Sequence, residues 1–277
     1  MLDVRLVRLL SVKELRDARR NRWFILYAVA FAGLALALSW LGLSAVRAYG
    51  LSGFGRTSAS LINLVLLIVP LMGISLGALS LAFERDQGTL LYILAQPVTL
   101  LEVLLGKFLG LSGALLSTLL IGFGASGLVI AWHGGTTEVS NYVTLLALAF
   151  VLALASLALG LLVSAWVKRS ATAVGLAVFL WSVLVIFGDL GLLSTALVLD
   201  LSAPQMLTLA LVNPLNAFKM AAILASHGNL EILGPAGQYA VRVFGNHMLT
   251  LLSTLLLAWI VVPLTLTYHV FRRRGVL

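Results

Sequence analysis

The sequence predicts an all-α membrane protein, a bundle of six transmembrane helices with both termini in the cytoplasm. Three observations lead to this prediction. Of the 277 residues, 61% are hydrophobic and only 10% are charged, whereas a soluble domain carries roughly 25% charged residues. The mean hydropathy is +1.09, and the chain divides into six apolar runs, each long enough to cross a bilayer. Finally, most Lys and Arg lie in the segments between the apolar runs that would face the same side of the membrane.

The apolar runs place the expected helices along one transmembrane domain, residues 1–277. We expect spans at about residues 24–46, 57–83, 108–132, 142–167, 170–199 and 248–270. These runs are too long for barrel strands, and none alternates with a period of two. The first follows 23 mostly polar residues and lacks a convincing cleavage site, so we expect it to remain as an anchor rather than act as a signal peptide.

The distribution of basic residues predicts the orientation. Fourteen Lys and Arg flank the spans on the side of residues 1–23 and 84–107, against four on the side of residues 200–247. The positive-inside rule therefore puts both termini in the cytoplasm. The net charge is +8. Because the basic residues lie at the ends of apolar spans, we expect them to contact anionic lipid headgroups and not nucleic acid. The chain has no cysteine, which excludes disulfides and thiolate metal sites.

Residues 84–107 form the most informative cytoplasmic segment. Gly88 permits a sharp turn, Thr89 is suited to cap a short helix, and Pro97 ends it. Thr99 and Glu102 have the spacing of a capping box that starts the next helix. The short helix is apolar, so it either inserts into a groove on a soluble partner or folds back onto the membrane interface. The residues assigned to the partner contact are Glu84, Arg85, Asp86, Gly88, Thr89, Leu90, Leu91, Ile93 and Leu94.

The N-terminal segment is the second candidate for a functional element. If it is helical throughout, Arg5, Arg8, Arg16 and Arg19 fall in one sector of about 80°. This arrangement suits a helix that lies along the inner leaflet, although a plain positively charged anchor explains the same residues. Ser11 and Glu14 have the spacing of a capping box.

Asp189 is the only acidic residue inside a predicted span. A stand-alone secondary transporter or channel would need such a group, but flanking Gly188 and Gly191 also suit a structural helix break. No histidine pair or Gly-x-Ser-x-Gly motif marks an intramembrane enzyme. The phosphate-binding Gly-x-x-x-x-Gly-Lys pattern is missing, because Leu101 stands where the first glycine before Gly106-Lys107 belongs. We therefore expect no catalytic residue and no metal or cofactor bound by this chain.

These segments together resemble the ABC-2 type permeases. The resemblance rests on residues 84–90, followed by Pro97 and by residues 105–108. Residues 13–15, 20–23, 121–124 and 189–193, with Asn213-Pro214, are similar to the members of this family that serve nitrous oxide reductase maturation.

The resemblance implies an ATP-driven transporter in which this chain is a non-catalytic membrane subunit. It implies a homodimer, a coupling helix within residues 84–107, and a separate soluble ABC ATPase that binds ATP and Mg. It implies a role in assembling a copper-sulfur centre, by moving a sulfur species or transmitting mechanical work to a periplasmic protein. The interface helix would use Lys13, Glu14, Asp17, Arg20 and Arg22, and the periplasmic protein would dock at Asn213, Pro214, Phe218 and Lys219.

Overall fold

The structure, a computed structural model, describes residues 3–49, 53–134, 139–199, 202–226 and 235–274. Within these ranges the secondary structure is helical, and no strand forms. The helices are α1 (Val4–Arg20), α2 (Arg22–Tyr49), α3 (Gly53–Asp86), α4 (Thr89–Leu94), α5 (Leu100–Gly134), α6 (Val139–Trp166), α7 (Ser170–Leu199), α8 (Ala203–Val212), α9 (Pro214–Ala225), α10 (Pro235–Phe244) and α11 (Met248–Arg274).

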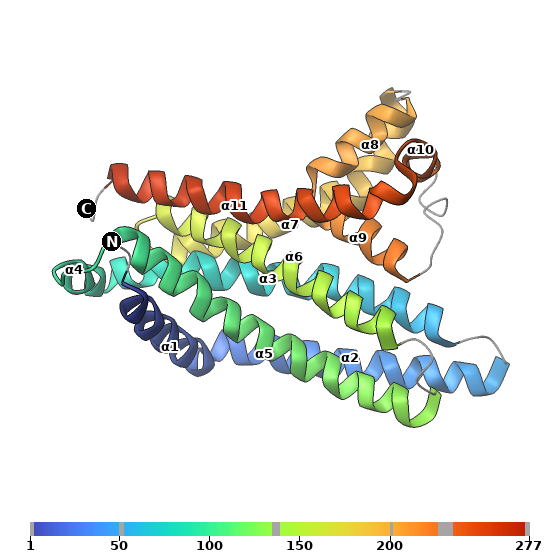
Figure 1. Cartoon of the computed structure of the whole chain (residues 1–277), viewed down its shortest axis with the longest axis horizontal. Coiled ribbons are helices and arrows are strands. Elements are labelled where there is room, and N and C mark those ends of the chain that lie inside the picture. Colours follow the sequence, from blue (N-terminus) through green and yellow to red (C-terminus); the bar gives the residue numbers. More distant parts are fainter. Residues whose placement is uncertain (1–2, 50–52, 135–138, 200–201, 227–234, 275–277) are drawn as a thin grey trace.

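Six helices are long and apolar enough to cross a membrane, which confirms the predicted fold class. The candidate spans are Arg22–Leu41, Ser60–Asp86, Leu100–Val129, Ser140–Trp166, Ser170–Gly188 and Met248–Arg273. They run side by side along the long axis of the molecule (Figure 1). The start of α1 and the end of α11 lie at the same end of the bundle as α4, as an even number of spans requires. We call this the α4 end.

Glycines bring α3 and α6 into the closest contact of the bundle. A Cβ atom on Gly77 would lie 2.5 Å from the carbonyl oxygen of Leu157, and one on Gly73 would lie 2.8 Å from Cβ of Ser156. A Cβ atom on Gly160 would collide with the carbonyl oxygen of Ile74. Small residues permit this backbone approach, which gives van der Waals contact where lipid provides no hydrophobic driving force.

Helix α1 packs along α5 and begins earlier than the capping-box prediction placed it. Asp3 is the N-cap and its side chain accepts a hydrogen bond from the Arg5 N–H. Ser11 instead lies inside the helix and donates to the carbonyl of Val7 at 2.8 Å, so the predicted box at Ser11 and Glu14 is wrong. Asn21 alone separates α1 from α2: its N–H bonds to Ala18, and its side chain accepts from the N–H of Trp23.

A bent helix pair enters the bundle at the end opposite α4. Helices α8 and α9 meet at an angle of 108°, and Asn213 ends the first and caps the second. Asn213 thus caps α9, and Pro214 occupies its first turn, where the missing N–H of proline costs no hydrogen bond. Asn213 also donates from Nδ2 to the carbonyl of Leu184 at 2.7 Å, and Asn216 donates to that of Gly188 at 3.1 Å. These bonds fix α9 against α7.

The burial of α9 corrects the predicted docking residues. Asn213, Pro214 and Phe218 are buried inside the chain itself, and Phe218 is completely inaccessible. Their role is to seat α9 among the spans, because a side chain packed in the interior cannot contact a separate protein. Docking at this end of the molecule stays a prediction, and the surface for it must be formed by other residues.

The α3–α6 contact predicts opposite effects for two chemically identical substitutions. Gly160→Ala forces the two backbones apart and should destabilise the protein by about 1–3 kcal/mol. Gly175→Ala, in α7, meets no atom within 4 Å and should be neutral, or stabilising by up to about 1 kcal/mol. Thermal unfolding in detergent measures both. Equal midpoints for the two variants would contradict the close crossing.

Candidate functional site

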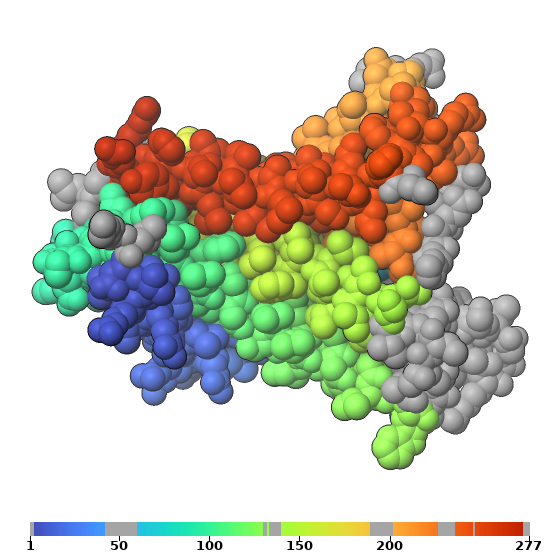
Figure 2. Space-filling model, viewed as in Figure 1, coloured from blue at the N-terminus to red at the C-terminus, as the bar shows by residue number. Residues whose placement is uncertain are grey.

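Helix α4 projects from its end of the bundle with one side anchored and the other free (Figures 1 and 2). Gly88 precedes it with a φ of 73°, a left-handed conformation that glycine adopts without steric cost. Leu90 is fully buried with Leu81, Ala165 and Phe271, whereas Leu91 and Tyr92 are 55% and 78% exposed. The apolar cluster predicted as one contact surface therefore has two parts, of which only the exposed part can meet a partner.

Thr89 does not cap α4, contrary to the sequence-based expectation. The N-cap position belongs to Gly88, and the Thr89 hydroxyl donates to the carbonyl of Glu84 at 3.2 Å. This bond ties the first turn of α4 back to the last turn of α3.

The end of α4 and the start of α5 agree with the sequence-based expectations. Ile93 and Leu94 are partly buried. The predicted capping box at Thr99 and Glu102 is confirmed, with both of its hydrogen bonds present.

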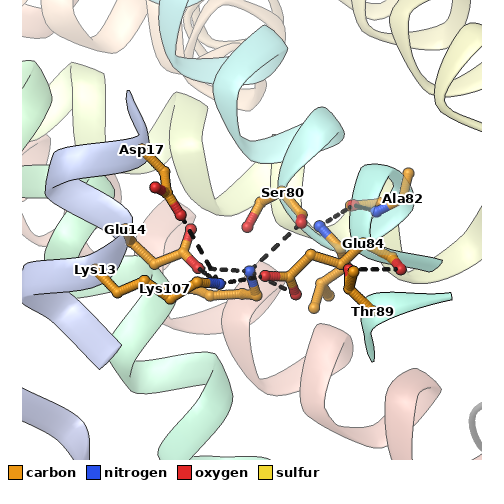
Figure 3. Close-up of polar contacts among 10 residues, drawn as sticks. Lys13, Glu14, Asp17, Ser80, Ala82, Glu84, Thr89 and Lys107 are labelled. Carbon is orange, nitrogen blue, oxygen red and sulfur yellow. Dashed lines mark hydrogen bonds and ion pairs between the residues drawn. The ribbon is translucent and has the colours of Figure 1, made fainter. Parts of the chain in front are cut away.

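A largely buried ion cluster lies at the end of α3 that leads into α4 (Figure 3). The Lys107 ammonium is 2.8 Å from Oε1 of Glu14 and 2.8 Å from Oε2 of Glu84, and its side chain is only 2% exposed. The ammonium of Lys13 lies 2.8 Å from the other oxygen of Glu84. Two carboxylates thus neutralise two ammonium groups, which is the condition for keeping charge inside an apolar bundle. The cluster joins α1, α3 and α5.

Close packing holds α1 in the position that the ion cluster needs. A Cβ on Gly110 of α5 would lie 2.7 Å from Cβ of Glu14, and one on Gly106 would lie 2.5 Å from Cβ of Leu10. Glu102 fixes the start of α1, because its Oε1 accepts the Asp3 N–H at 2.7 Å. Helix α1 is therefore packed into the bundle next to α4 and is not a separate anchor. We call the joined ends of α1, α3 and α5 the platform beneath α4.

Arg85 and Asp86, which follow Glu84 in α3, connect the platform to α6 and α7. Arg85 donates to the carbonyl of Val167, beyond the end of α6, at 2.6 Å. Asp86 accepts from the N–H of Ser170, the first residue of α7, at 3.2 Å and from its hydroxyl at 2.5 Å. Cations near a helix C-terminus and anions near an N-terminus are both favourable. Glu84, Arg85 and Asp86 thus fix the base of α4 to four other helices.

The hydroxyl of Ser164 adds a second link between α3 and α6. It accepts hydrogen bonds from the N–H groups of Leu81 and Ala82 at 2.9 and 2.8 Å. Ser164 itself is completely buried. A side chain that bonds to the backbone of a neighbouring helix in this way can locally bend that helix. The two hydrogen bonds lie within one turn before Glu84, close to the start of α4.

Lys13 stays charged throughout the physiological pH range. Burial of its ammonium acts to lower the pKa, but the hydrogen bonds and negative charges of Glu84 and Glu14 outweigh this effect and raise the pKa above its ordinary value. A raised folded-state pKa stabilises the fold fully below the ordinary pKa of lysine, and the contribution is lost only as the pH rises through the folded-state value.

Sequence reasoning missed the partners of Lys107 and the second role of Glu102. Lys107 counted only as a positive charge flanking a span, although a lysine at the entrance to an apolar run signals a need for a counter-ion. Of the predicted interface-helix residues, Lys13 and Glu14 join the ion cluster and Asp17 lies at its edge, 3.9 Å from Lys13. Arg20 and Arg22 are exposed.

The opposite end contains a pocket with both polar and apolar lining, but it offers no test of the Asp189 hypothesis. The side chain of Asp189 lies outside the described residues. Lys219, which is partly exposed, lines a pocket of about 310 Å³ together with Asn63 and Asn216, and its predicted contact with a partner stays a prediction. Among the described residues, no three His, Asp or Glu side chains form a group that could hold a metal ion.

The ion cluster predicts unequal effects for its two lysines. Lys107→Met leaves two buried carboxylates facing each other and should cost about 3–5 kcal/mol of stability. Lys13→Met removes a side chain that is 44% exposed, so its cost should be about 1 kcal/mol or less. Thermal unfolding of the purified variants provides the comparison, with exposed Lys168→Met as the control. Similar losses for Lys107 and Lys13 would contradict the central position of Lys107.

Comparison with known proteins agrees with this architecture. Residues 9–276 match the model of a family described as ABC-2 family transporter protein. A Stutzerimonas stutzeri protein named probable ABC transporter permease protein NosY is 33% identical, over 95% of this chain and 96% of the relative. A Pseudomonas aeruginosa protein with the same name is 31% identical, over 95% and 97%. The chain therefore belongs to the ABC-2 family of transporter proteins and is a permease subunit with several membrane spans.

Proposed function

We propose that this chain is the non-catalytic membrane subunit of an ATP-driven transporter, and that α4 receives a separate soluble ABC ATPase. The observation that carries the proposal is the division of α4 between an anchored and a free side. Leu91 and Tyr92 present apolar surface to the outside, which is suited to insertion into a groove of a partner. Leu90 and the residues from Glu84 to Asp86 hold the helix to the bundle.

This arrangement allows a force on α4 to reach most of the spans. A displacement of α4 acts on α3 directly, on α1 and α5 through Glu84, and on α6 and α7 through Arg85 and Asp86. Leu90 adds contacts to α6 and α11. A rigid and multiply connected base is what transmission of motion between subunits requires, because a loosely attached helix would move alone. In this proposal the α4 end faces the cytoplasm, where ATP and Mg are available.

The similarity to proteins named NosY supports a more specific role. We infer that the chain works as a homodimer with a NosF-like ATPase and a NosD-like periplasmic protein, in the inner membrane of a bacterium. Such an assembly would serve the maturation of the copper-sulfur centre of nitrous oxide reductase. The subunit would move a sulfur species or transmit mechanical work to the periplasmic protein.

Charge on the free side of α4 should abolish ATPase binding without unfolding the protein. Leu91→Glu and Tyr92→Glu each put a carboxylate where an apolar groove would close over it. Loss of one residue that dominates binding at an interface costs about 2 kcal/mol or more, so co-purified ATPase should fall at least about thirtyfold. Pull-down in mild detergent with quantitative mass spectrometry measures the loss, and thermal unfolding should be unchanged.

Leu90→Glu provides the matched comparison one residue earlier. Its carboxylate would be buried among Leu81, Ala165 and Phe271, so this variant should lose thermal stability as well as the ATPase. If Leu91→Glu and Tyr92→Glu retain a full complement of ATPase, α4 is not the coupling helix.

A periplasmic partner should depend on the opposite end of the molecule instead. Val241 and Val243 of α10 are 39% and 52% exposed, and α10 lies beside α8 away from the α4 end (Figure 1). Val243→Glu should reduce co-purification of the periplasmic protein about tenfold or more while the ATPase is retained, since charge at the centre of an interface is strongly unfavourable. A variant that loses the ATPase and keeps the periplasmic protein would reverse the proposed assignment of the two ends.

A further inference from the structure

Helix α1 carries a basic face that its packing leaves uncovered. At 100° per residue its exposed arginines fall in one sector of about 120°, and Leu9 and Val12 lie between them, 67% and 47% exposed. The opposite side of α1 holds Glu14 and Ala18, which are buried against α5. In Figure 2 α1 lies on the outside of the bundle, beside the α4 end. The arginines of this face are Arg5, Arg8, Arg16, Arg19 and Arg20.

The face has no acidic residue to neutralise it. Asp3 caps the helix, Glu14 is buried with Lys107, and Asp17 lies beside Lys13 at the edge. None of the five arginines forms an ion pair with any residue in the described part of the chain. A surface with several unneutralised guanidinium groups and interspersed apolar side chains is complementary to anionic phosphate above hydrocarbon.

The packing of α1 places this face at the membrane boundary. Residues of α1 contact Gly106, Gly110 and Gly113 of α5, and the candidate span of α5 starts at Leu100. Trp23, 63% exposed, follows directly at the start of the first span. Exposed tryptophan at the end of a span is typical of the headgroup level. The outward face of α1 therefore lies where phospholipid headgroups are.

We propose that the basic face of α1 is a binding surface for anionic phospholipid headgroups, and that the bound lipid keeps α1 seated on α5. A ligand that binds the seated helix stabilises the folded protein by mass action. Because α1 supplies Glu14 and Lys13 to the ion cluster, the lipid would support the platform beneath α4. The inference does not depend on the identity of the ATPase or of any transported species.

Lipid retention by the purified chain tests the proposal. The protein is reconstituted in nanodiscs of equimolar phosphatidylglycerol and phosphatidylcholine, released into detergent, and the retained lipids are counted by native mass spectrometry. The wild type should prefer phosphatidylglycerol. Each arginine near an anionic surface contributes about fivefold in affinity, so the triple variant Arg8→Gln, Arg16→Gln, Arg19→Gln should lose roughly a hundredfold.

Matched variants separate charge on α1 from charge in general. The triple Arg→Lys variant at the same positions preserves the charge and should keep most of the preference. Arg272→Gln with Arg273→Gln removes exposed cations from α11 at the same end and should reduce the preference much less than the triple Gln variant does. If the triple Gln variant proves unstable, the single variant Arg16→Gln should still show the fivefold loss.

A second readout tests the stabilising role of the lipid. Phosphatidylglycerol should raise the thermal unfolding midpoint of the wild type above its value in pure phosphatidylcholine, and the triple Gln variant should show little of this increase. The proposal is overturned if that variant keeps the wild-type lipid preference, or if the α11 variant loses as much. Full retention of phosphatidylglycerol with loss of the ATPase would mean that the face docks the ATPase instead. Lipid retention and thermal unfolding are both measured on the purified chain alone. Their results can therefore be interpreted even if the proposed binding of the ATPase to α4 is wrong.

Discussion

A charged lysine in an apolar bundle must be neutralised, and at the α4 end this requirement determines the position of three helices. The Lys107 ammonium is almost fully enclosed, and removing an ion from water costs several kcal/mol unless partners compensate. Its partners come from α1 and α3 at 2.8 Å each. If α1 moved away, Glu14 would leave with it and Lys107 would lose half of its counter-charge. Helices α1, α3 and α5 therefore behave as one unit.

The same principle of shared anchoring explains the form of α4. A short helix of six residues is unstable by itself, since nucleation costs more than so few hydrogen bonds return. It persists because Gly88 sets its direction, Thr89 ties it to α3, and Leu90 fills a site between α3, α6 and α11. The bundle thus stabilises α4, and the exposed side chains of Leu91 and Tyr92 are not needed to hold the helix in place. They are available to contact a partner.

The features predicted from the sequence are those with a local cause. Apolar length gives the six spans, Gly88 gives the turn before α4, and the spacing of Thr99 and Glu102 gives the capping box at the start of α5. The errors and omissions concern contacts between distant segments. Nothing in the spacing of residues 90 and 91 tells which leucine is buried, because the answer depends on Ala165 and Phe271. Likewise, Glu14 and Lys107 are 93 residues apart, and Ser11 matched a capping pattern inside a helix that tertiary packing extends.

The glycine contact between α3 and α6 has a mechanical consequence. Two helices whose backbones touch cannot slide or roll past one another without separating, so they tilt together as a single lever. Helix α3 has 34 residues and is therefore about 51 Å long at about 1.5 Å per residue. Tilting such a lever by about 5° about one end moves the other end by about 4 Å, which is less than the pitch of about 5.4 Å of one helical turn. A helix of this length can thus convert a small rotation at one membrane surface into a displacement of side-chain size at the other.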